Sequence, residues 1–327
     1  MNPSFAVPLT LPELTTKKIR IHELFFDFLS RLFTAIPIAA LVYMLGKIFL
    51  EGGHIVTWEF LTQTPVEGMT EGGIFPCIFG TFMVTLLMIL MALPLGIGAA
   101  IYLSEYGGNG VLVRVIRAAV NNLAGVPSIV FGLFGVGFFI LFVGRNIDRV
   151  LQTGLLFGQP CMLWAAATLS VLVLPVIIVS TEEALNSIPQ SHRAASLALG
   201  ATKWETIRHV VLPQARAGIL TGAILAVSRG AGETAPILFT GCAYFLPHLP
   251  VVKLFGVVPM VNPLNQFMEL SYHIFIMATQ SVDAQKTLPI QYGTTLVLIT
   301  LTFIFNLTAI ISRIYFRRKL GAAAAAH

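Results

Sequence analysis

The sequence predicts an all-α membrane protein with six transmembrane helices. Of its 327 residues, 56% are hydrophobic and only 11% are charged, whereas a soluble domain carries about 25% charged residues. Windows without any charged residue run over 72–104, 118–144, 150–181 and 287–312. Each is longer than the roughly 20 residues that a helix needs to cross the hydrocarbon core of a bilayer. These four windows are therefore predicted to be membrane spans.

Two further apolar stretches complete the six spans. The stretch 32–46 reaches about residue 50 because the long side chain of Lys47 can extend to the membrane surface. The stretch 217–245 contains Arg229 and Glu233, so it can span only if both side chains face protein or water. Within the second span, Pro94 is expected to bend the helix.

The remaining segments are predicted to lie outside the membrane. Residues 1–30 are expected to form a cytoplasmic tail, with a short amphipathic piece at 21–29, before a transmembrane domain over 31–316. Residues 317–327 are expected to form a C-terminal tail, whose run of alanines has the character of an appended remnant. The segment 246–289 contains five prolines, and the apolar spacing of 266–279 predicts a helix along the membrane surface.

The distribution of basic residues predicts the orientation of the chain. With both termini in the cytoplasm, fourteen Lys and Arg residues fall in inner segments and five in outer segments. This asymmetry follows the positive-inside rule. The net charge of +5 is thus explained by membrane topology, without a nucleic-acid partner. The three cysteines and the scattered histidines have no metal-ligand spacing, and no catalytic Ser/His/Asp or Cys/His set stands out.

Arg229 and Glu233 are the main candidate functional residues. A charged side chain within a span costs about 2.5–3.5 kcal/mol on insertion scales, and the two lie one helical turn apart. We interpret them as part of a solute path, with the hydroxyl of Thr234 beside them. The alternative is an ion pair that only packs one helix against another. Further candidates for lining the path are Asn121, Asn122 and Ser128, whereas the Gly218/Gly222 pair is interpreted as helix packing.

A charged stretch at 182–213 lies between two spans and is predicted to fold into two short helices around Gly200. Its apolar ridge, which includes Trp204, would be a liability in water without a partner. A DNA-binding helix-turn-helix has a similar outline, but this unit is tied to the bilayer at both ends. We therefore predict that it docks a cytoplasmic protein.

The same stretch resembles the coupling loop of ABC importer permeases, in which Glu-Ala-Ala is followed by a glycine and then by Leu-Pro. The matching residues here are Ala194, Ala195, Ser196, Gly200, Leu212 and Pro213. Ala194 stands where the family pattern has glutamate. The segment 229–240 further resembles the Gly-Glu-Thr-Ala-Pro segment of phosphate-specific permeases, the A subunit of the Pst system. Matching motifs at 60–65, 72–74, 80–81, 94–96 and 102–106 extend the resemblance over about 58–316.

This resemblance implies the architecture of a type I ABC importer permease in the bacterial inner membrane. The implied partners are a homologous second permease subunit, a dimer of ATP-binding subunits, a periplasmic phosphate-binding protein and inorganic phosphate. The coupling residues would be Ala194, Ala195, Ser196, Gly200, Trp204, Leu212 and Pro213. The chain has no Gly-x-x-x-x-Gly-Lys-Ser/Thr loop, so ATP and Mg are expected in the partner ATPase and no cofactor or enzymatic activity in this chain.

The chemistry of Arg229 agrees with a small oxyanion as substrate, because a guanidinium offers a planar fork of donors and stays charged. Glu233 can neutralise Arg229 when the path is empty or, if protonated, donate a hydrogen bond to the anion. Sulfate, tungstate and molybdate are alternative substrates. An ATP-independent carrier and a membrane scaffold are alternative classes of protein.

Overall fold

A computed structural model describes residues 16–66, 69–108, 110–254, 258–281 and 283–325. The chain divides into two compact units, residues 1–50 and 51–327, which we treat separately. Six helical segments of the described chain are long and apolar enough to span a membrane. They are Glu23–Gly53, Phe75–Tyr106, Ser128–Leu151, Met162–Asn186, Lys203–Gly230 and Ala284–Tyr315. The predicted all-helical, six-span fold class is confirmed.

The first unit consists of most of helix α1, Thr16–Gly53. Residues 16–30 of the expected tail are helical and continuous with the spanning helix, and their cytoplasmic position stays a prediction. No glycine or proline interrupts the sequence between Thr16 and Pro37, so nothing ends the helix at the membrane surface. The expected tail at 1–15 lies outside the described residues.

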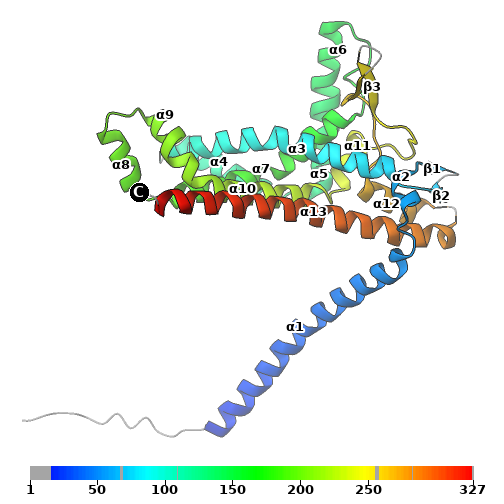
Figure 1. Cartoon of the computed structure of the whole chain (residues 1–327), viewed down its shortest axis with the longest axis horizontal. Coiled ribbons are helices and arrows are strands. Elements are labelled where there is room, and N and C mark those ends of the chain that lie inside the picture. Colours follow the sequence, from blue (N-terminus) through cyan, green and yellow to red (C-terminus); the bar gives the residue numbers. More distant parts are fainter. Residues whose placement is uncertain (1–15, 67–68, 109, 255–257, 282, 326–327) are drawn as a thin grey trace, which may run out of the picture. The chain divides into compact units, whose positions relative to one another are not determined.

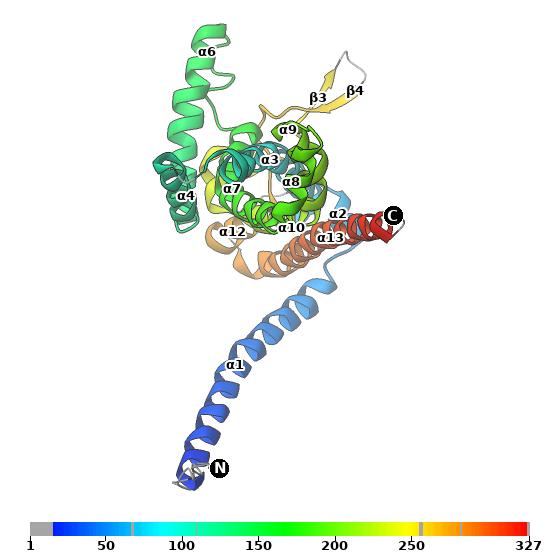
Figure 2. The same ribbon diagram turned by 90° about the vertical axis from the view of Figure 1, so that its left-hand side faces the viewer.

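Helix α7, Met162–Asn186, forms the centre of the second unit. It packs against α3 (Phe75–Ile101) and α10 (Leu212–Gly230), and α13 (Ala284–Ala325) lies along α10 (Figure 1). Figure 2 looks along this bundle and shows α3, α7 and α10 grouped together, with α13 beside α10. Most of α7 is buried, as expected for a helix that is apolar on every side.

Small residues allow α10 to approach α7 closely. A Cβ atom on Gly218 would meet the side chain of Ala184, and one on Gly222 would meet the side chain of Ser180. Small residues at these positions let two backbones make dispersion contacts in lipid, where the hydrophobic effect does not drive association. The packing role predicted for this glycine pair is confirmed.

The two ends of the bundle carry different elements (Figure 1). One end carries α8 (Gln190–Ala198) and α9 (Lys203–Thr206). The other carries the elements α2 (Trp58–Thr62), β1 (Pro65–Val66), β2 (Glu71–Gly72) and α12 (Leu270–Gln280). Strands β1 and β2 are antiparallel, as are β3 (Val251–Leu254) and β4 (Val258–Val261), which form a hairpin that the sequence did not predict.

Helix α12 corrects the expectation of a surface helix at 266–279. It packs against α3 and α13, and its residues Leu270, His273, Ile276 and Met277 are buried. The buried carboxylate of Glu269 holds the start of this helix, because it accepts hydrogen bonds from the Tyr272 amide at 2.8 Å and the Ser271 hydroxyl at 2.6 Å. Burial raises the pKa of Glu269 to about 7. The segment is thus part of the protein interior, because its apolar side faces other helices.

The third span begins later than predicted. The window 118–144 is divided between α4 (Val111–Leu123) and a spanning helix made of α5 (Ser128–Phe134), the π-helical segment η3 (Gly135–Gly144) and α6 (Arg145–Leu151). Pro127 cannot donate to the carbonyl of Leu123, four residues earlier, so α4 ends there. Asn121 and Asn122 consequently belong to a separate amphipathic helix, outside the third span.

The fifth span also differs from the predicted window 217–245. A continuous helical stretch runs from α9 through the π-helical segment η4 (Ile207–Val211) into α10 and ends at Gly230. After residues 231–234 a short helix follows, α11 (Ala235–Thr240). Pro236 lies in the first turn of α11, where its missing N–H leaves no intrahelical hydrogen bond unmade. The fifth span is therefore interrupted.

The helices also extend into two segments that the sequence placed outside the spans. Helix α13 continues to Ala325, so the expected tail at 317–327 is helical for its described part. Helix α7 continues to Asn186 and α10 starts at Leu212, so both ends of the predicted 182–213 loop belong to spanning helices. Leu212 and Pro213 form the first turn of α10, where proline is compatible with a helix.

Candidate functional site

The candidate path residues Arg229 and Glu233 lie together where the fifth span is interrupted. Arg229 is in the last turn of α10, and Glu233 is in the non-helical stretch 231–234. Arg229 Nε lies 3.5 Å from Glu233 Oε1, with 33% and 20% of the two side chains exposed. This distance is longer than the 2.7–2.9 Å of a strong charge-assisted hydrogen bond. The described residues provide no other polar partner for the Arg229 guanidinium, so its other N–H groups are available to a ligand.

The pair lies at the middle of the bundle. A Cβ on Gly230, the residue after Arg229, would meet Met88 and Val173. Met88 is at the midpoint of α3, and Val173 is near the midpoint of α7. The ion pair therefore lies near the midpoints of α3 and α7, at the depth where an unmatched charge costs most.

A second interruption reaches the same depth. Leu123 and Val126, at the two sides of the α4–α5 connection, pack against the core cluster that contains Met88 and Val173. Non-helical backbone at membrane depth is tolerated only inside protein or beside a water-filled cavity. Two such stretches, 124–127 and 231–234, thus mark the interior face of this subunit.

The structure brings together some of the predicted path residues and separates others. Thr234 is the residue before α11, in the same interruption as Glu233. Ser128 starts α5, which packs against α11: a Cβ on Gly132 would lie 2.9 Å from the Ala235 carbonyl oxygen. The arrangement therefore places Ser128 and Thr234 on neighbouring elements.

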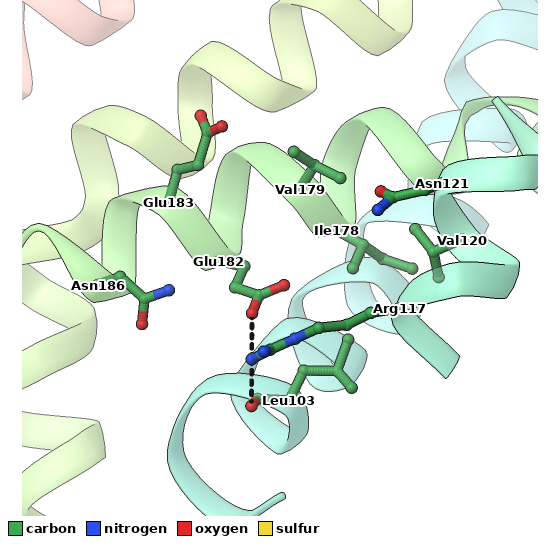
Figure 3. Close-up of a pocket in the computed structure, with 9 residues that line it drawn as sticks. All are labelled: Leu103, Arg117, Val120, Asn121, Ile178, Val179, Glu182, Glu183 and Asn186. Atoms are coloured by element: carbon green, nitrogen blue, oxygen red, sulfur yellow. Dashed lines mark hydrogen bonds and ion pairs between the residues drawn. The ribbon is translucent and has the colours of Figure 1, made fainter. Parts of the chain in front are cut away.

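Asn121 lies instead in a pocket of about 230 Å³ between α4 and α7 (Figure 3). Arg117 crosses this pocket: one of its Nη atoms lies 2.6 Å from Glu182 Oε1 and donates to the Leu103 carbonyl at 3.1 Å. Glu183 also lines the pocket. Two carboxylates against one guanidinium make this a poor anion site, so we interpret Arg117 as a link between α4, α7 and the end of α3. Asn122 is exposed and lies on α4, whereas Arg229 lies on α10.

The predicted docking unit is a compact hairpin of helices. Gly200 has φ +88°, a left-handed conformation that costs other residues about 1–2 kcal/mol, and it reverses the chain between α8 and α9. Thr202 and Glu205 form a capping box at the start of α9, and Ser196 and Thr206 hydroxyls lie 2.9 Å apart. The pattern of two short helices around Gly200 is confirmed.

The tip of this hairpin is apolar and exposed. Leu199 is 89% exposed, and Leu197 and Trp204 are about half exposed. Ala194 and Ala195 are also exposed on α8. By contrast, Leu212 packs against the core cluster at this end of the bundle, so Leu212 and Pro213 are part of the base of the unit.

A buried ion pair fastens the hairpin to the bundle. Arg193 of α8 donates to Glu105 Oε1 at 2.8 and 3.1 Å, and to the carbonyls of Ile188 and Leu185 at 2.7 and 2.8 Å. Glu105 belongs to η2 (Tyr102–Tyr106), the π-helical extension of α3, and both charged side chains are about nine-tenths buried. Sequence reasoning missed this pair because 88 residues separate its members and no local pattern connects them.

Solved structures share this fold. The chain superimposes on a bacterial ABC transporter that imports the acidic polysaccharide alginate, with a TM-score of 0.59 and 14% identity over 89% of this chain and 97% of that one. It also superimposes on the inward-facing MetNI methionine ABC transporter, with a TM-score of 0.53 and 19% identity over 75% of this chain and 94% of that one. The fold is therefore that of an ABC importer permease, as the coupling-loop resemblance implied.

Sequence comparison gives the family. Residues 92–321 match the family described as binding-protein-dependent transport system inner membrane component, and this chain belongs to that family. It is 32% identical to the probable ABC transporter permease protein YqgI of Bacillus subtilis strain 168, over 84% of this chain and 89% of that protein. It is 36% identical to the phosphate transport system permease protein PstA of Mycobacterium leprae, over 68% of each chain. The resemblance to Pst-type permeases is confirmed.

Breaking the Arg193–Glu105 pair is expected to destabilise the docking end of the bundle. In Arg193→Ala, Glu105 remains as a buried, unpaired charge, which costs about 3–5 kcal/mol. Unfolding in detergent, followed by a probe on α8, should show this loss. Arg193→Lys should recover only part of it, because an ammonium cannot form the same fork of donors.

Lys286→Ala is the control, since Lys286 and Asp283 form an exposed pair at 3.9 Å whose loss should cost less than about 1 kcal/mol. Equal stability of Arg193→Ala and Lys286→Ala would contradict the anchoring role of Arg193.

Proposed function

We propose that this chain is a permease subunit of an ATP-driven importer of inorganic phosphate, and that it forms half of the translocation path. The observation that carries this proposal is the Arg229–Glu233 pair in an interrupted helix at mid-bundle. Family membership supports an importer, and the names of the phosphate transport relatives support phosphate. Sulfate, tungstate and molybdate are the alternative substrates, because a guanidinium can bind any of these oxyanions.

Arg229 would bind the passing anion. Its single contact with Glu233 leaves most of its N–H groups without a protein partner among the described residues. A phosphate could therefore form a two-pronged interaction with the guanidinium without first displacing a strong hydrogen bond. Thr234 and Ser128 are proposed to add hydroxyl groups along the path, and Asn121 and Asn122 to contribute farther along α4.

Glu233 would keep this binding weak. When the path is empty, its carboxylate compensates the Arg229 charge, and an arriving anion must compete with it. Transport requires a site that binds well enough to admit the ion and weakly enough to release it. The alternative, a protonated Glu233 that donates to the anion, would make transport depend on pH.

The α8–α9 hairpin would dock the ATPase. Its exposed apolar tip at Leu197, Leu199 and Trp204 needs a cover in the cytoplasm. Alanine at position 194, where the family pattern has glutamate, leaves a docking surface that relies on these apolar contacts. The buried Arg193–Glu105 pair would carry hairpin movement to α3, and η4 would carry it directly into α10 towards Arg229.

The complete transporter would contain this chain, a homologous second permease, two ATP-binding subunits and a periplasmic phosphate-binding protein. ATP and Mg would bind only to the ATPase.

The hairpin and both termini would lie in the cytoplasm of a bacterium. The opposite end of the bundle, with α2, β1, β2 and α12, would face the binding protein. An ATP-independent carrier would not need the hairpin, and a scaffold would not need the Arg229–Glu233 pair.

The uptake assay is the direct test of Arg229. In liposomes with the partner subunits, Arg229→Ala should lower ATP-driven phosphate uptake by about 10-fold to 100-fold. This loss corresponds to one or two charge-assisted hydrogen bonds. Arg229→Lys should retain intermediate activity. Each variant must be shown to assemble with its partners, and Arg149→Ala, on exposed α6, serves as the matched control.

Normal uptake by assembled Arg229→Ala would contradict the transport role of Arg229, and loss of assembly would favour a role in helix packing.

Sulfate uptake with a sulfate-binding protein, measured in parallel, tests which oxyanion is the substrate. Glu233→Gln separates the two roles of Glu233. If uptake by the native protein does not depend on pH and the variant retains the anion more tightly, Glu233 neutralises Arg229. If uptake by the native protein depends on pH and the variant loses this dependence, Glu233 donates a hydrogen bond to the anion.

Replacement of Leu199 tests ATPase docking. Leu199→Ser should weaken ATPase binding by about tenfold or more, because burying a leucine contributes about 1.5–3 kcal/mol. The permease itself should fold normally, since Leu199 is 89% exposed. Leu155→Ser, in a position that is 67% exposed beyond the other end of the spans, is the control. Unchanged co-purification of Leu199→Ser with the ATPase would contradict docking through this tip.

A further inference from the structure

A groove of about 570 Å³ lies between α3 and the continuous η4–α10 helix, near the docking hairpin. It is lined by Ile97, Arg208, Leu212, Arg216, Ile219 and Leu220. Four of these six side chains are apolar, and the other two are arginines. The groove therefore combines a hydrophobic floor with positive charge.

The two arginines differ from Arg117 and Arg193 at the same end of the bundle. Arg117 and Arg193 are fixed by carboxylates, whereas Arg208 and Arg216 form no ion pair or hydrogen bond through their side chains within the described residues. Both are exposed, and the spacing 208, 212, 216 places them with Leu212 on one stripe of the helix. Two unneutralised guanidinium groups on one stripe favour an anionic ligand.

The depth of the groove indicates where this ligand comes from. Ile97 follows the mid-bundle residue Met88 by nine positions, or roughly 14 Å at 1.5 Å per residue, close to the inner edge of a hydrocarbon core of about 15 Å half-thickness. Arg216 precedes mid-bundle Gly230 by fourteen positions, or roughly 21 Å, which is headgroup depth. Arg208 is about two turns farther out, roughly 12 Å beyond Arg216 and on the aqueous side of the headgroups. The apolar floor thus lies at the edge of the acyl chains, Arg216 lies at headgroup depth, and Arg208 faces the headgroups from the water.

We propose that this groove binds an anionic phospholipid, with its phosphate between Arg208 and Arg216 and an acyl chain along Ile97, Ile219 and Leu220. Basic pockets between spanning helices on the cytoplasmic side suit such headgroups. A free phosphate would gain nothing from the apolar floor, and a soluble protein could not reach Ile97 in the hydrocarbon. Because η4 joins the hairpin to α10, the bound lipid would brace the docking unit against the bundle.

Native mass spectrometry of the full chain, alone and assembled with its partner subunits, tests this site. The protein is released from micelles that contain phosphatidylglycerol and phosphatidylcholine in equal amounts. The native protein should retain phosphatidylglycerol preferentially, and each arginine near the membrane surface contributes about fivefold to binding an anionic lipid. Arg208→Gln/Arg216→Gln should therefore lower retention about 25-fold.

Two variants show whether the groove itself is responsible. Arg114→Gln removes an exposed cation from α4, outside the groove, and should leave retention unchanged. Ile97→Trp fills the floor while both arginines remain, and it should also release the lipid. The thermal midpoint of each variant in detergent establishes that it is folded.

Four results would overturn the proposal. The first is equal retention of the two lipids by the native protein, and the second is undiminished phosphatidylglycerol binding by the double variant. The third is displacement of the lipid by millimolar inorganic phosphate, which would identify a site for the free anion. Loss of the lipid only on assembly would mean that a partner subunit covers the groove, and this too would contradict a lipid-braced transporter.

Discussion

The structure depends on one constraint: backbone hydrogen bonds within a membrane must be formed by the protein itself. A continuous helix meets this constraint, and most of the bundle is continuous. Two interruptions come directly before helices that start at prolines, α5 after Pro127 and α11 with Pro236 in its first turn. These interruptions must face protein or water. The Arg229–Glu233 pair lies at one of these interruptions. Non-helical backbone and charged side chains, which are both unfavourable in lipid, therefore occur at the same site.

The docking end has a different design, in which two arginines are held by carboxylates. Arg117 joins α4 to α7 and to the Leu103 carbonyl, and Arg193 joins α8 to Glu105. Ser104 and Asn186 add a hydrogen bond of 2.9 Å between the end of α3 and α7. These contacts converge on η2, and π-helical segments often occur at functional sites. The pairs at this end fasten the hairpin to the extension of α3, whereas the Arg229–Glu233 pair at mid-bundle is longer, at 3.5 Å.

Periodicity and charge predicted much of this fold, since long charge-free windows define the spans over most of the bundle. The same reasoning failed at two prolines. Gly125 with Pro127, and Gly232 with Pro236, are signals that end helices, yet the surrounding residues are so apolar that hydropathy alone extends each span across them. A proline alone does not mark an interruption, because Pro94 and Pro175 lie inside the continuous helices α3 and α7.

The candidate site was only partly predictable from the sequence. The cost of charge in lipid was enough to single out Arg229 and Glu233, and Gly200 marked the hairpin turn. The pairs Arg193–Glu105 and Arg117–Glu182 could not be found this way. Their members are far apart in sequence and lie near the ends of spans, where a charge has a low cost and therefore gives little information.

Cysteine accessibility tests most directly whether the interruption at 231–234 lines an anion path. Gly232 is exposed and has room for a Cβ, and the native Cys77, Cys161 and Cys242 are buried, so a Gly232→Cys variant offers one reactive thiol. In the assembled transporter, this thiol should react with a charged reagent, and phosphate should slow the reaction, whereas Gly98→Cys on the outside of α3 should show no phosphate effect. An unreactive Gly232→Cys in every nucleotide state, or a rate that phosphate does not change, would contradict a path at Arg229.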